Sequence, residues 1–308
     1  MPYLEDLTIR LATAVAELPE EVRQLHTDYL LAAQQPDGGF AGREGGSDLY
    51  YTGFALRGLS ILGGLYGEPA ERAADFLRQR MQGQETIIDF LSLIYGGALL
   101  ELSAGIDIYE QAGDGWRPSV GATLERLRCD DGGYAKGPEG RAGSTYHSFL
   151  VLLCLQLLEQ PLPEPQKLAQ FIRSQQHEQG GFLEIRAGKR AGTNPTAAAI
   201  GVLRILDELD EPTREDTVDF LLEMQNDDGG IRANTRIPFS DVLSSFTALL
   251  TLADLNGLDE LDREAAARYL RRMESEEGGF YGVELDDQRD VEYTFYGLGA
   301  RALLTAAK

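Results

Sequence analysis

The 308-residue chain has few cysteines and few histidines, which argues against a disulfide-stabilised protein and against a zinc site built from these residues. Cys129 and Cys154 are the only cysteines, too few for a disulfide framework. The histidines are His26, His147 and His177. His147 and Cys154 lie seven residues apart on one expected helix, roughly 10 Å along its axis, too far to share a zinc ion. We expect structural roles for all five residues, although His147, near a helix start, also suits an acid, a base or a ligand.

Basic residues are scarce as well: 28 Lys and Arg stand against 50 Asp and Glu, a net charge of −22. Such a surface repels phosphate backbones, so we expect no nucleic-acid partner. The charge serves either to attract a basic partner or to keep the protein soluble. No apolar run reaches the roughly 20 residues of a membrane span. Residues 1–18 contain Glu5 and Asp6 and lack the pattern of a secretory signal, so we expect a cytoplasmic protein without a membrane span.

Sustained alternation of apolar and polar residues is absent, so the sequence predicts no strands. What recurs instead is a Gly-Gly pair, whose first glycine stands at 38, 132, 180, 229 and 278. The steps are 94, 48, 49 and 49 residues, and the first is close to two periods. Such a period indicates one supersecondary unit repeated side by side. The divergent second repeat has Gln82-Gly83-Gln84-Glu85 in place of Gly-Gly, with a shortened loop.

The fifth repeat illustrates the unit. Thr213 and Asp216 form a capping-box pattern at the start of one helix, which ends before Gly229. Ser240 or Asp241 then begins a second helix that is apolar on nearly every face. A helix that is apolar all round is buried all round, so the second helix of each unit is expected to lie inside.

The same pattern predicts six helical hairpins. Outer helices are expected near residues 20–34, 69–82, 118–128, 163–176, 213–225 and 262–274. Inner helices are expected near residues 48–62, 87–101, 145–159, 195–206, 241–253 and 290–304. The repeats span about 20–62, 69–101, 118–159, 163–206, 213–253 and 262–304, after an extra N-terminal helix in residues 1–18.

We predict one all-α domain over residues 1–308, an (α/α)6 toroid with an apolar central cavity. An open solenoid is the alternative, but it would need polar terminal caps. The last inner helix, with Phe295 and Leu298, is as apolar as the middle ones. In a closed ring the inner helices run the same way, so their N-termini and the Gly-Gly loops meet at one mouth.

The segment Gln35-Pro36-Asp37-Gly38-Gly39-Phe40, followed by Asp48-Leu49-Tyr50-Tyr51-Thr52, resembles the repeat of protein prenyltransferase β subunits. Squalene and oxidosqualene cyclases carry a related repeat. The resemblance covers residues from about 20 to 308. It implies an α/α toroid whose aromatic cavity holds an isoprenoid chain, a catalytic zinc bound by three residues, and a helical α-type partner subunit.

Only one of the three zinc-ligand positions implied by this resemblance is kept. Asp241 matches the aspartate, but Leu243 stands at the cysteine and Tyr293 at the histidine. Leucine cannot bind a metal and neutral tyrosine binds zinc poorly. We therefore expect no zinc and no other cofactor, with Asp241 a ligand only if a metal is bound. Mg²⁺ could accompany a diphosphate, held by carboxylates at the mouth.

The candidate site residues lie near the expected mouth and on the inner helices. The catalytic candidates are Asp241, Asp290, Tyr293 and His147. The candidates for binding a diphosphate are Arg232, Arg236, Lys189 and Arg190, which solvated loop charges would explain equally. The candidates for binding the rest of the substrate, as the lining of the cavity, are Tyr50, Tyr51, Tyr146, Phe149, Phe246 and Tyr296, which ordinary core packing would also explain. Aspartates at helix starts are common caps, so the acidic mouth has a structural explanation as well.

Four functions fit this sequence. The first is a prenyltransferase-β-like protein that binds or acts on an isoprenoid diphosphate without zinc. The second is a class II type terpene cyclase, which needs a buried acid; Glu284-Leu285-Asp286-Asp287 resembles the cyclase motif only loosely. The third is a carbohydrate-active α/α barrel with two carboxylates at its mouth. The fourth is a non-catalytic lipid-binding or protein-docking toroid.

Overall fold

The computed structural model describes residues 1–81, 86–113 and 115–306, and the chain is mostly helical there. The outer helices are α2 (Glu20–Ala32), α4 (Gly67–Arg80), α6 (Trp116–Glu125), α8 (Pro165–Ser174), α10 (Glu211–Glu223) and α12 (Arg263–Met273). The inner helices are α3 (Leu49–Leu62), α5 (Ile87–Ala104), α7 (Thr145–Leu157), α9 (Thr193–Ile205), α11 (Val242–Asp254) and α13 (Val291–Ala306). Helix α1 (Tyr3–Val15) precedes them, and a short 3-10 helix, η1 (Leu258–Glu260), follows α11.

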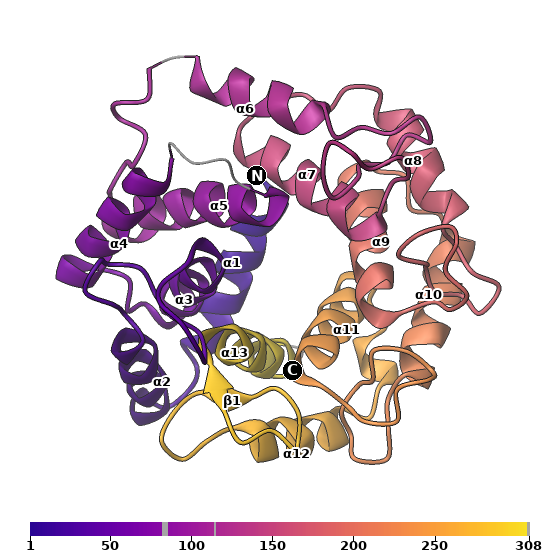
Figure 1. Cartoon of the computed structure of the whole chain (residues 1–308). Helices are drawn as coiled ribbons and strands as arrows, with labels where there is room; N and C mark the ends of the chain where they lie inside the picture. Colours follow the sequence, from indigo (N-terminus) through magenta and orange to yellow (C-terminus); the bar gives the residue numbers. More distant parts are fainter. Residues whose placement is uncertain (82–85, 114, 307–308) are drawn as a thin grey trace.

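The helices form a closed ring, seen down its axis in Figure 1. Each inner helix packs against the next in chain order, and α13 packs back against α3. The predicted toroid is therefore confirmed, and the open solenoid is excluded. The burial of the inner helices explains their sequence, since ten of the fourteen residues of α3 are buried.

Helix α5 alone among the described helices is long and apolar enough to cross a membrane, with a mean hydropathy of 1.6. The sequence predicts no membrane span. In the ring α5 packs between α3 and α7, and 56% of the helix is buried inside the protein. Its apolar character therefore suits a core helix of the inner ring.

Each Gly-Gly turn packs onto the next outer helix, which is why both positions are glycine. The first glycines have φ between +83° and +93°, a region that other residues rarely adopt. A Cβ atom on Gly229 would lie 2.2 Å from the carbonyl oxygen of Ala265 in α12, and one on Gly230 would lie 2.8 Å from the Tyr269 ring. The turn and the helix backbone are thus in direct contact.

The residue after each Gly-Gly pair is fully buried and tied to its own inner helix. These residues are Phe40, Tyr134, Phe182, Ile231 and Phe280, each at most 1% exposed. Their amides donate hydrogen bonds of 2.8–3.2 Å to Thr52, Ser148, Thr196, Ser245 and Thr294. A hydroxyl in each of these inner helices therefore fixes the loop that ends at the mouth.

The ring is closed by the same contact that joins its repeats. Gly278 and Gly279 of the last repeat pack against Leu25 and Tyr29 of the first outer helix, α2. His26, fully buried beside them, accepts a hydrogen bond from the amide of Gly279 at 3.0 Å through Nδ1. Its Nε2 lies 3.0 Å from the Glu274 carboxylate. His26 therefore has a structural role where the two ends of the ring meet.

Three local expectations differ from the structure or lie outside it. Helix α10 begins at Glu211 and is capped by Asp210, whose carboxylate accepts from the amide of Thr213, so the helix starts before the predicted capping box. Two short strands, β1 (Phe280–Tyr281) and β2 (Arg289–Asp290), form an antiparallel pair, although the sequence predicts no strands. Segments of two residues are too short to show an alternation of apolar and polar side chains. The predicted Gln82–Glu85 turn lies outside the described residues.

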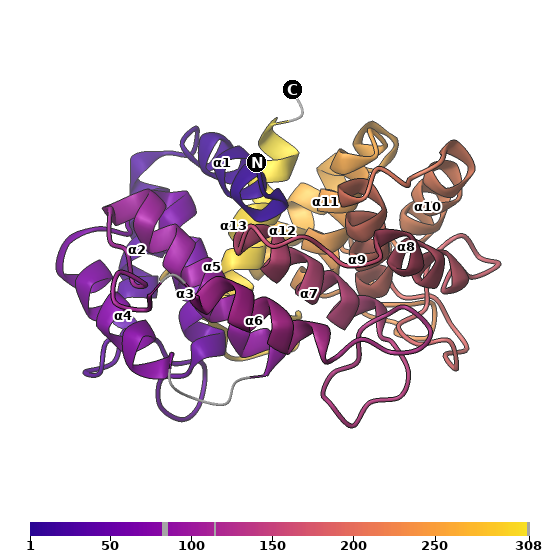
Figure 2. The ribbon, with the colours of Figure 1, turned by 90° about the horizontal axis from the view of Figure 1, so that it is seen from above.

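Helix α1 lies across one end of the ring (Figure 2). It packs mainly against α13 and α3 and also contacts α7. The phenol of Tyr3 donates to the carboxylate of Asp254 at 2.9 Å, and Arg10 forms an ion pair with the same carboxylate at 2.8 Å. Because Asp254 is the last residue of α11, these bonds tie α1 to the end of the ring opposite the mouth.

We predict that Gly229→Ala lowers the free energy of unfolding by about 2–5 kcal/mol, because both φ and the carbonyl of Ala265 oppose a side chain. The control is Gly45→Ala, since Gly45 also has positive φ (+85°) but nothing within 4 Å of a Cβ. It should cost only about 1–2 kcal/mol. Denaturant unfolding measures both variants, and equal losses would contradict the contact.

Candidate functional site

A cavity of ≈ 490 Å³ lies inside the ring and is lined by all six inner helices and by α1. Its lining runs from first-turn residues such as Tyr50 and Glu292 to Tyr3, Leu4 and Leu7 of α1. The cavity is therefore bounded by α1 at the end opposite the Gly-Gly loops. Its walls are mostly apolar, as the burial of the inner helices requires.

Aromatic rings form one side of this cavity. Phe54 makes ring contacts with Tyr50 and Tyr296, with centroids 5.0 and 5.1 Å apart. Phe246 contacts Phe295 at 5.5 Å. The small residues Ala197 and Ala198, with Pro195, contribute the wall from α9. Large side chains on neighbouring helices and small ones on α9 thus leave the space unfilled.

The predicted aromatic residues divide into two groups. Tyr50, Tyr146, Phe149, Phe246 and Tyr296 line the cavity. Tyr51 does not line it; its ring lies against that of Tyr50, at 5.3 Å between centroids. Their roles in binding a substrate stay predictions.

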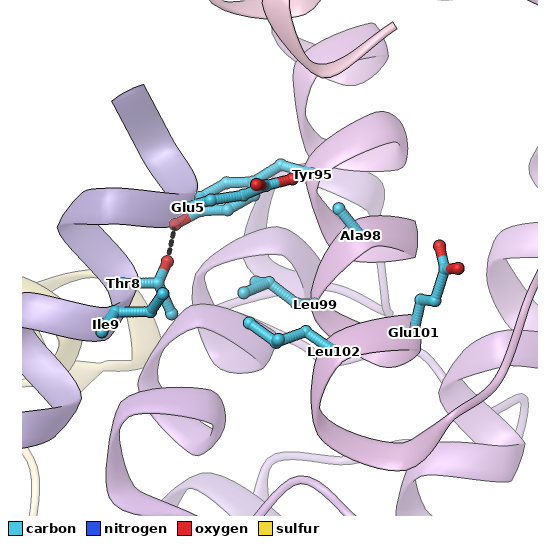
Figure 3. A pocket seen from close by; sticks show the side chains of 8 residues that line it. All are labelled: Glu5, Thr8, Ile9, Tyr95, Ala98, Leu99, Glu101 and Leu102. Atoms are coloured by element: carbon cyan, nitrogen blue, oxygen red, sulfur yellow. Dashed lines mark hydrogen bonds between the residues drawn. The ribbon is translucent and has the colours of Figure 1, made fainter. Parts of the chain in front are cut away.

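Tyr95 of α5 separates this cavity from a smaller pocket of ≈ 340 Å³ between α1 and α5. Figure 3 shows the smaller pocket, with the Tyr95 hydroxyl hydrogen-bonded to Thr8 of α1. The same hydroxyl donates to the carbonyl of Leu4 at 3.1 Å. The ring of Tyr95 is therefore held in place from the α1 side.

The carboxylates at the mouth already have hydrogen-bond partners. Asp241 caps α11 and accepts from the amide and the hydroxyl of Ser244 at 2.6 and 2.8 Å. Asp290, 4% exposed, caps α13 and pairs with Arg43 at 2.8 Å. Burial raises the pKa of both carboxyl groups, although these hydrogen bonds oppose the rise. Both aspartates therefore act as helix caps, the structural alternative to a catalytic role.

Glu292 is the mouth carboxylate that also lines the cavity. It accepts a hydrogen bond from the Tyr50 phenol at 2.7 Å. Burial raises the pKa of Glu292, and this hydrogen bond opposes the rise. Glu292 is thus a carboxyl group beside the aromatic wall whose neutral form is favoured over that of an exposed glutamate.

His147 lies at the start of α7 in a chain of polar contacts. Its Nδ1 is 2.8 Å from the hydroxyl of Ser144, and that hydroxyl donates to Glu184, which lines the cavity. Since the Ser144 hydrogen is given to Glu184, its oxygen can only accept from Nδ1–H. His147 itself does not line the cavity, and its role as an acid or base stays a prediction.

The predicted basic residues lie in the loops and not in the cavity lining. Arg236, Lys189 and Arg190 are exposed. Arg232 is half-buried and donates to the carbonyl of Glu223 at 3.0 Å. Their diphosphate-binding role stays a prediction.

Two of the three positions that the resemblance gives to zinc ligands carry side chains that do not bind zinc well. Leu243 lines the cavity as an apolar side chain. Burial, followed by the charges of Glu292 and Asp290, raises the pKa of Tyr293 to about 12, which keeps its phenol neutral. The described residues contain no group of three His, Cys, Asp or Glu side chains suited to a metal ion.

Arg57, Glu184 and the floor residues of α1 line the cavity but were not among the predicted site residues. A signal for Arg57 was present, because it is the one charged residue of the apolar helix α3. Glu184 comes from a loop and Tyr3 from α1, so only the tertiary structure brings them to the cavity.

Comparison with protein families identifies the repeat. The family model described as the prenyltransferase alpha-alpha toroid domain matches residues 18–87, 104–236 and 198–308. No curated protein matches the chain.

Several solved structures share the fold at low sequence identity. Protein geranylgeranyltransferase-I of Candida albicans, complexed with GGPP, has a TM-score of 0.74 at 18% identity, covering 92% of this chain and 91% of that one. The type II terpene cyclase MstE of Scytonema has a TM-score of 0.64 at 16% identity, covering 97% and 98%. An alpha-1,6-mannanase of Salegentibacter has a TM-score of 0.59 at 12% identity, covering 92% and 98%.

We predict that His147 titrates below 6.5, because burial and then the charge of Lys136 lower its pKa. Its contribution to stability is then lost as the pH falls from 6.5 through that lower value, since the unfolded chain takes up the proton first. NMR titration of the imidazole C–H signals measures the midpoint, with His147→Gln to assign the signal. A midpoint at or above 6.5 would show that the side chain is open to water.

Proposed function

The chain belongs to the prenyltransferase alpha-alpha toroid family, and from this premise we propose that its central cavity binds an isoprenoid chain. The observation that carries the proposal is the aromatic cavity of ≈ 490 Å³, bounded by α1 at the far end of the ring. An isoprenoid is a branched hydrocarbon with regularly spaced double bonds. It gains about 25 cal/mol for each Å² of apolar surface that the cavity removes from water.

The mouth supports a polar head group at the open end of the chain. Arg232 and Arg236 stand in the loop before α11, and Lys189 and Arg190 stand in the preceding loop. We propose these residues for contacts with a diphosphate, and a Mg²⁺ ion that accompanies it would be held by the lone pairs that Asp241 and Asp290 do not use in their helix caps. The comparison that bears on this is the Candida albicans relative, which was solved with GGPP.

We propose that the protein works without zinc. Its Asp241 is engaged by Ser244, while Leu243 and Tyr293 offer no thiolate or imidazole. Activation of a substrate thiol by zinc is therefore not the chemistry that these residues favour. Prenyl transfer without zinc would need an acceptor that a protein base activates, and His147 is the candidate for that base. A protein that only binds the isoprenoid would need no such base.

The second candidate function is a type II terpene cyclase. It is supported by Glu292, a carboxyl group with a raised pKa beside the aromatic rings that could shield a carbocation. Against it stands Arg57, a permanent cation in the lining of the same cavity. Like charges a few ångströms apart repel strongly in a medium of low dielectric constant. We therefore favour isoprenoid binding over cyclisation.

Two further features are proposals by resemblance and composition. A helical α-type subunit would cover part of the outer surface. The cytoplasm is the proposed location, since both described cysteines are free.

We predict that geranylgeranyl diphosphate binds with a micromolar or lower Kd in isothermal titration calorimetry. Ala197→Phe should weaken binding at least about tenfold, because the new ring fills the small-residue wall of the cavity. Ala197→Ser is the control, since it changes the volume little. Tighter binding with Mg²⁺ would support the acidic mouth as its site.

The absence of binding by the unmodified protein, with and without Mg²⁺, would overturn the proposed function. Binding that Ala197→Phe leaves unchanged would place the ligand outside the cavity. Conversion of the ligand to a cyclic isomer that keeps its diphosphate would favour the cyclase, because protonation of a double bond leaves the head group in place.

We also predict that protein purified without chelators contains far less than one zinc ion per chain. The reason is that only Asp241 of the implied ligand set can bind the ion. Elemental analysis by mass spectrometry measures the ratio, and Asp241→Asn serves as the control for metal held elsewhere. A ratio near one that falls in this variant would restore a metal centre at the mouth.

A further inference from the structure

Arg57 is a cation of the cavity lining that acts on its neighbours through space, since burial raises the pKa of the Glu292 carboxyl group and the charge of Arg57 opposes that rise. Its side chain lines the central cavity. Among the described residues no carboxylate forms an ion pair with it, and its Nε is buried without a hydrogen-bond partner. The side chain as a whole is half-buried, but a buried guanidinium nitrogen without a partner is costly, so its place in the cavity needs an explanation.

Two aromatic rings hold the guanidinium in position. Its central carbon lies 4.6 Å from the centroid of the Phe54 ring and 5.0 Å from that of Tyr95. Rings over the guanidinium interact with its face, whereas the five N–H donors point outward in its plane. The Tyr95 ring is itself held by a hydrogen bond between its hydroxyl and Thr8 (Figure 3) and by a second one to the carbonyl of Leu4. The stacking therefore orients the donors without satisfying them.

The acidic residues of the cavity lining have donors of their own. Glu292 accepts from the Tyr50 phenol at 2.7 Å, and Glu184 accepts from the Ser144 hydroxyl. The arginine of the mouth, Arg43, is by contrast paired with Asp290 at 2.8 Å. Arg57 thus differs from both, because it lines the cavity and its buried Nε has no hydrogen-bond partner among the described residues.

We propose that Arg57 binds the anionic head group of an amphipathic ligand inside the cavity. The chemistry it recognises is an acidic oxygen pair, a carboxylate or a phosphate, attached to an isoprenoid chain. This deepens the proposed function and rests on it. A charge-assisted bond in this low-dielectric space is stronger than one to the exposed Arg236 at the mouth. The head group then lies among the rings of Phe54 and Tyr95, so the inference rests on the isoprenoid-binding cavity alone and offers an alternative to the loop residues at the mouth.

The test compares three ligands of equal chain length: geranylgeranoic acid, geranylgeranyl diphosphate and the neutral geranylgeraniol. Competition against a fluorescent isoprenoid analogue gives their affinities for the unmodified protein and for Arg57→Met and Arg57→Lys. Methionine keeps an unbranched side chain of similar reach and removes the charge. Lysine keeps the charge but not the planar set of donors.

Arg57→Met should weaken binding of an anionic ligand by roughly ten- to hundredfold and leave the alcohol unchanged or tighter. Arg57→Lys should retain part of the preference for the anion. A loss confined to geranylgeranoic acid identifies a carboxylate as the head group, and a loss confined to the diphosphate identifies a phosphate. The alcohol also reports whether the cavity of each variant is intact.

Two results separate this inference from the proposed function. If the unmodified protein binds the three ligands equally and Arg57→Met changes none of them, the isoprenoid cavity stands and the role of Arg57 is wrong. An equal loss for acid and alcohol would likewise overturn the role, because it reports a disturbed cavity wall. If none of the ligands binds, the proposed function fails and the inference fails with it.

Discussion

The contact between a Gly-Gly turn and the backbone of the next outer helix is the constraint on which the structure depends. At the five turns that carry the pair it brings a repeat into direct contact with its neighbour, because no side chain separates the two backbones. The same contact joins Gly278 and Gly279 to α2, so the rule that adds one repeat to the next also closes the ring. Closure leaves no terminal repeat with an exposed apolar inner helix. It also brings the N-termini of the inner helices to one mouth.

The cavity follows from this closure. Six inner helices around an axis leave a space that their side chains either fill or line. Here large rings such as Phe246 and Phe54 stand on some helices, while α9 contributes Ala197 and Ala198. Helix α1, which is outside the repeat, then supplies the floor through Tyr3 and Leu7. The space is therefore a blind apolar pocket, a shape suited to a hydrocarbon chain that enters from the mouth.

The charged residues near this pocket differ in how far their hydrogen bonds and ion pairs within the protein already occupy them. Asp241 and Asp290 cap helices, and Arg43 neutralises Asp290, so these groups stabilise the mouth first. Glu292 and Glu184 have hydroxyl donors. Among the residues that the structure describes, Arg57 alone combines a permanent positive charge in the cavity lining with a buried nitrogen that lacks a partner. Polar groups in a mostly apolar pocket determine which head group and which reaction it accepts, and this arrangement favours an anion over a carbocation.

Much of the fold could be predicted from the amino-acid order alone. Repeat length, outer and inner helices and the closed ring are local or periodic properties, and the Gly-Gly period and the apolar faces of helices such as α11 carry them. Ring order also placed Tyr50, Tyr296 and Phe246 correctly around the axis, because each lies on the inward part of an inner helix.

Contacts between residues that are distant in sequence became known only from the tertiary structure, because a periodic pattern does not encode them. The tertiary structure showed that α1 closes one end of the ring, that Glu184 reaches the cavity from a loop, and that Tyr51 packs against Tyr50 without lining the cavity. It also determined which charges are paired: Arg43 and Asp290 are distant in sequence and meet only because the ring closes. Whether a nitrogen such as Nε of Arg57 finds a hydrogen-bond partner depends on contacts between separate repeats. Those contacts exist only in the assembled ring.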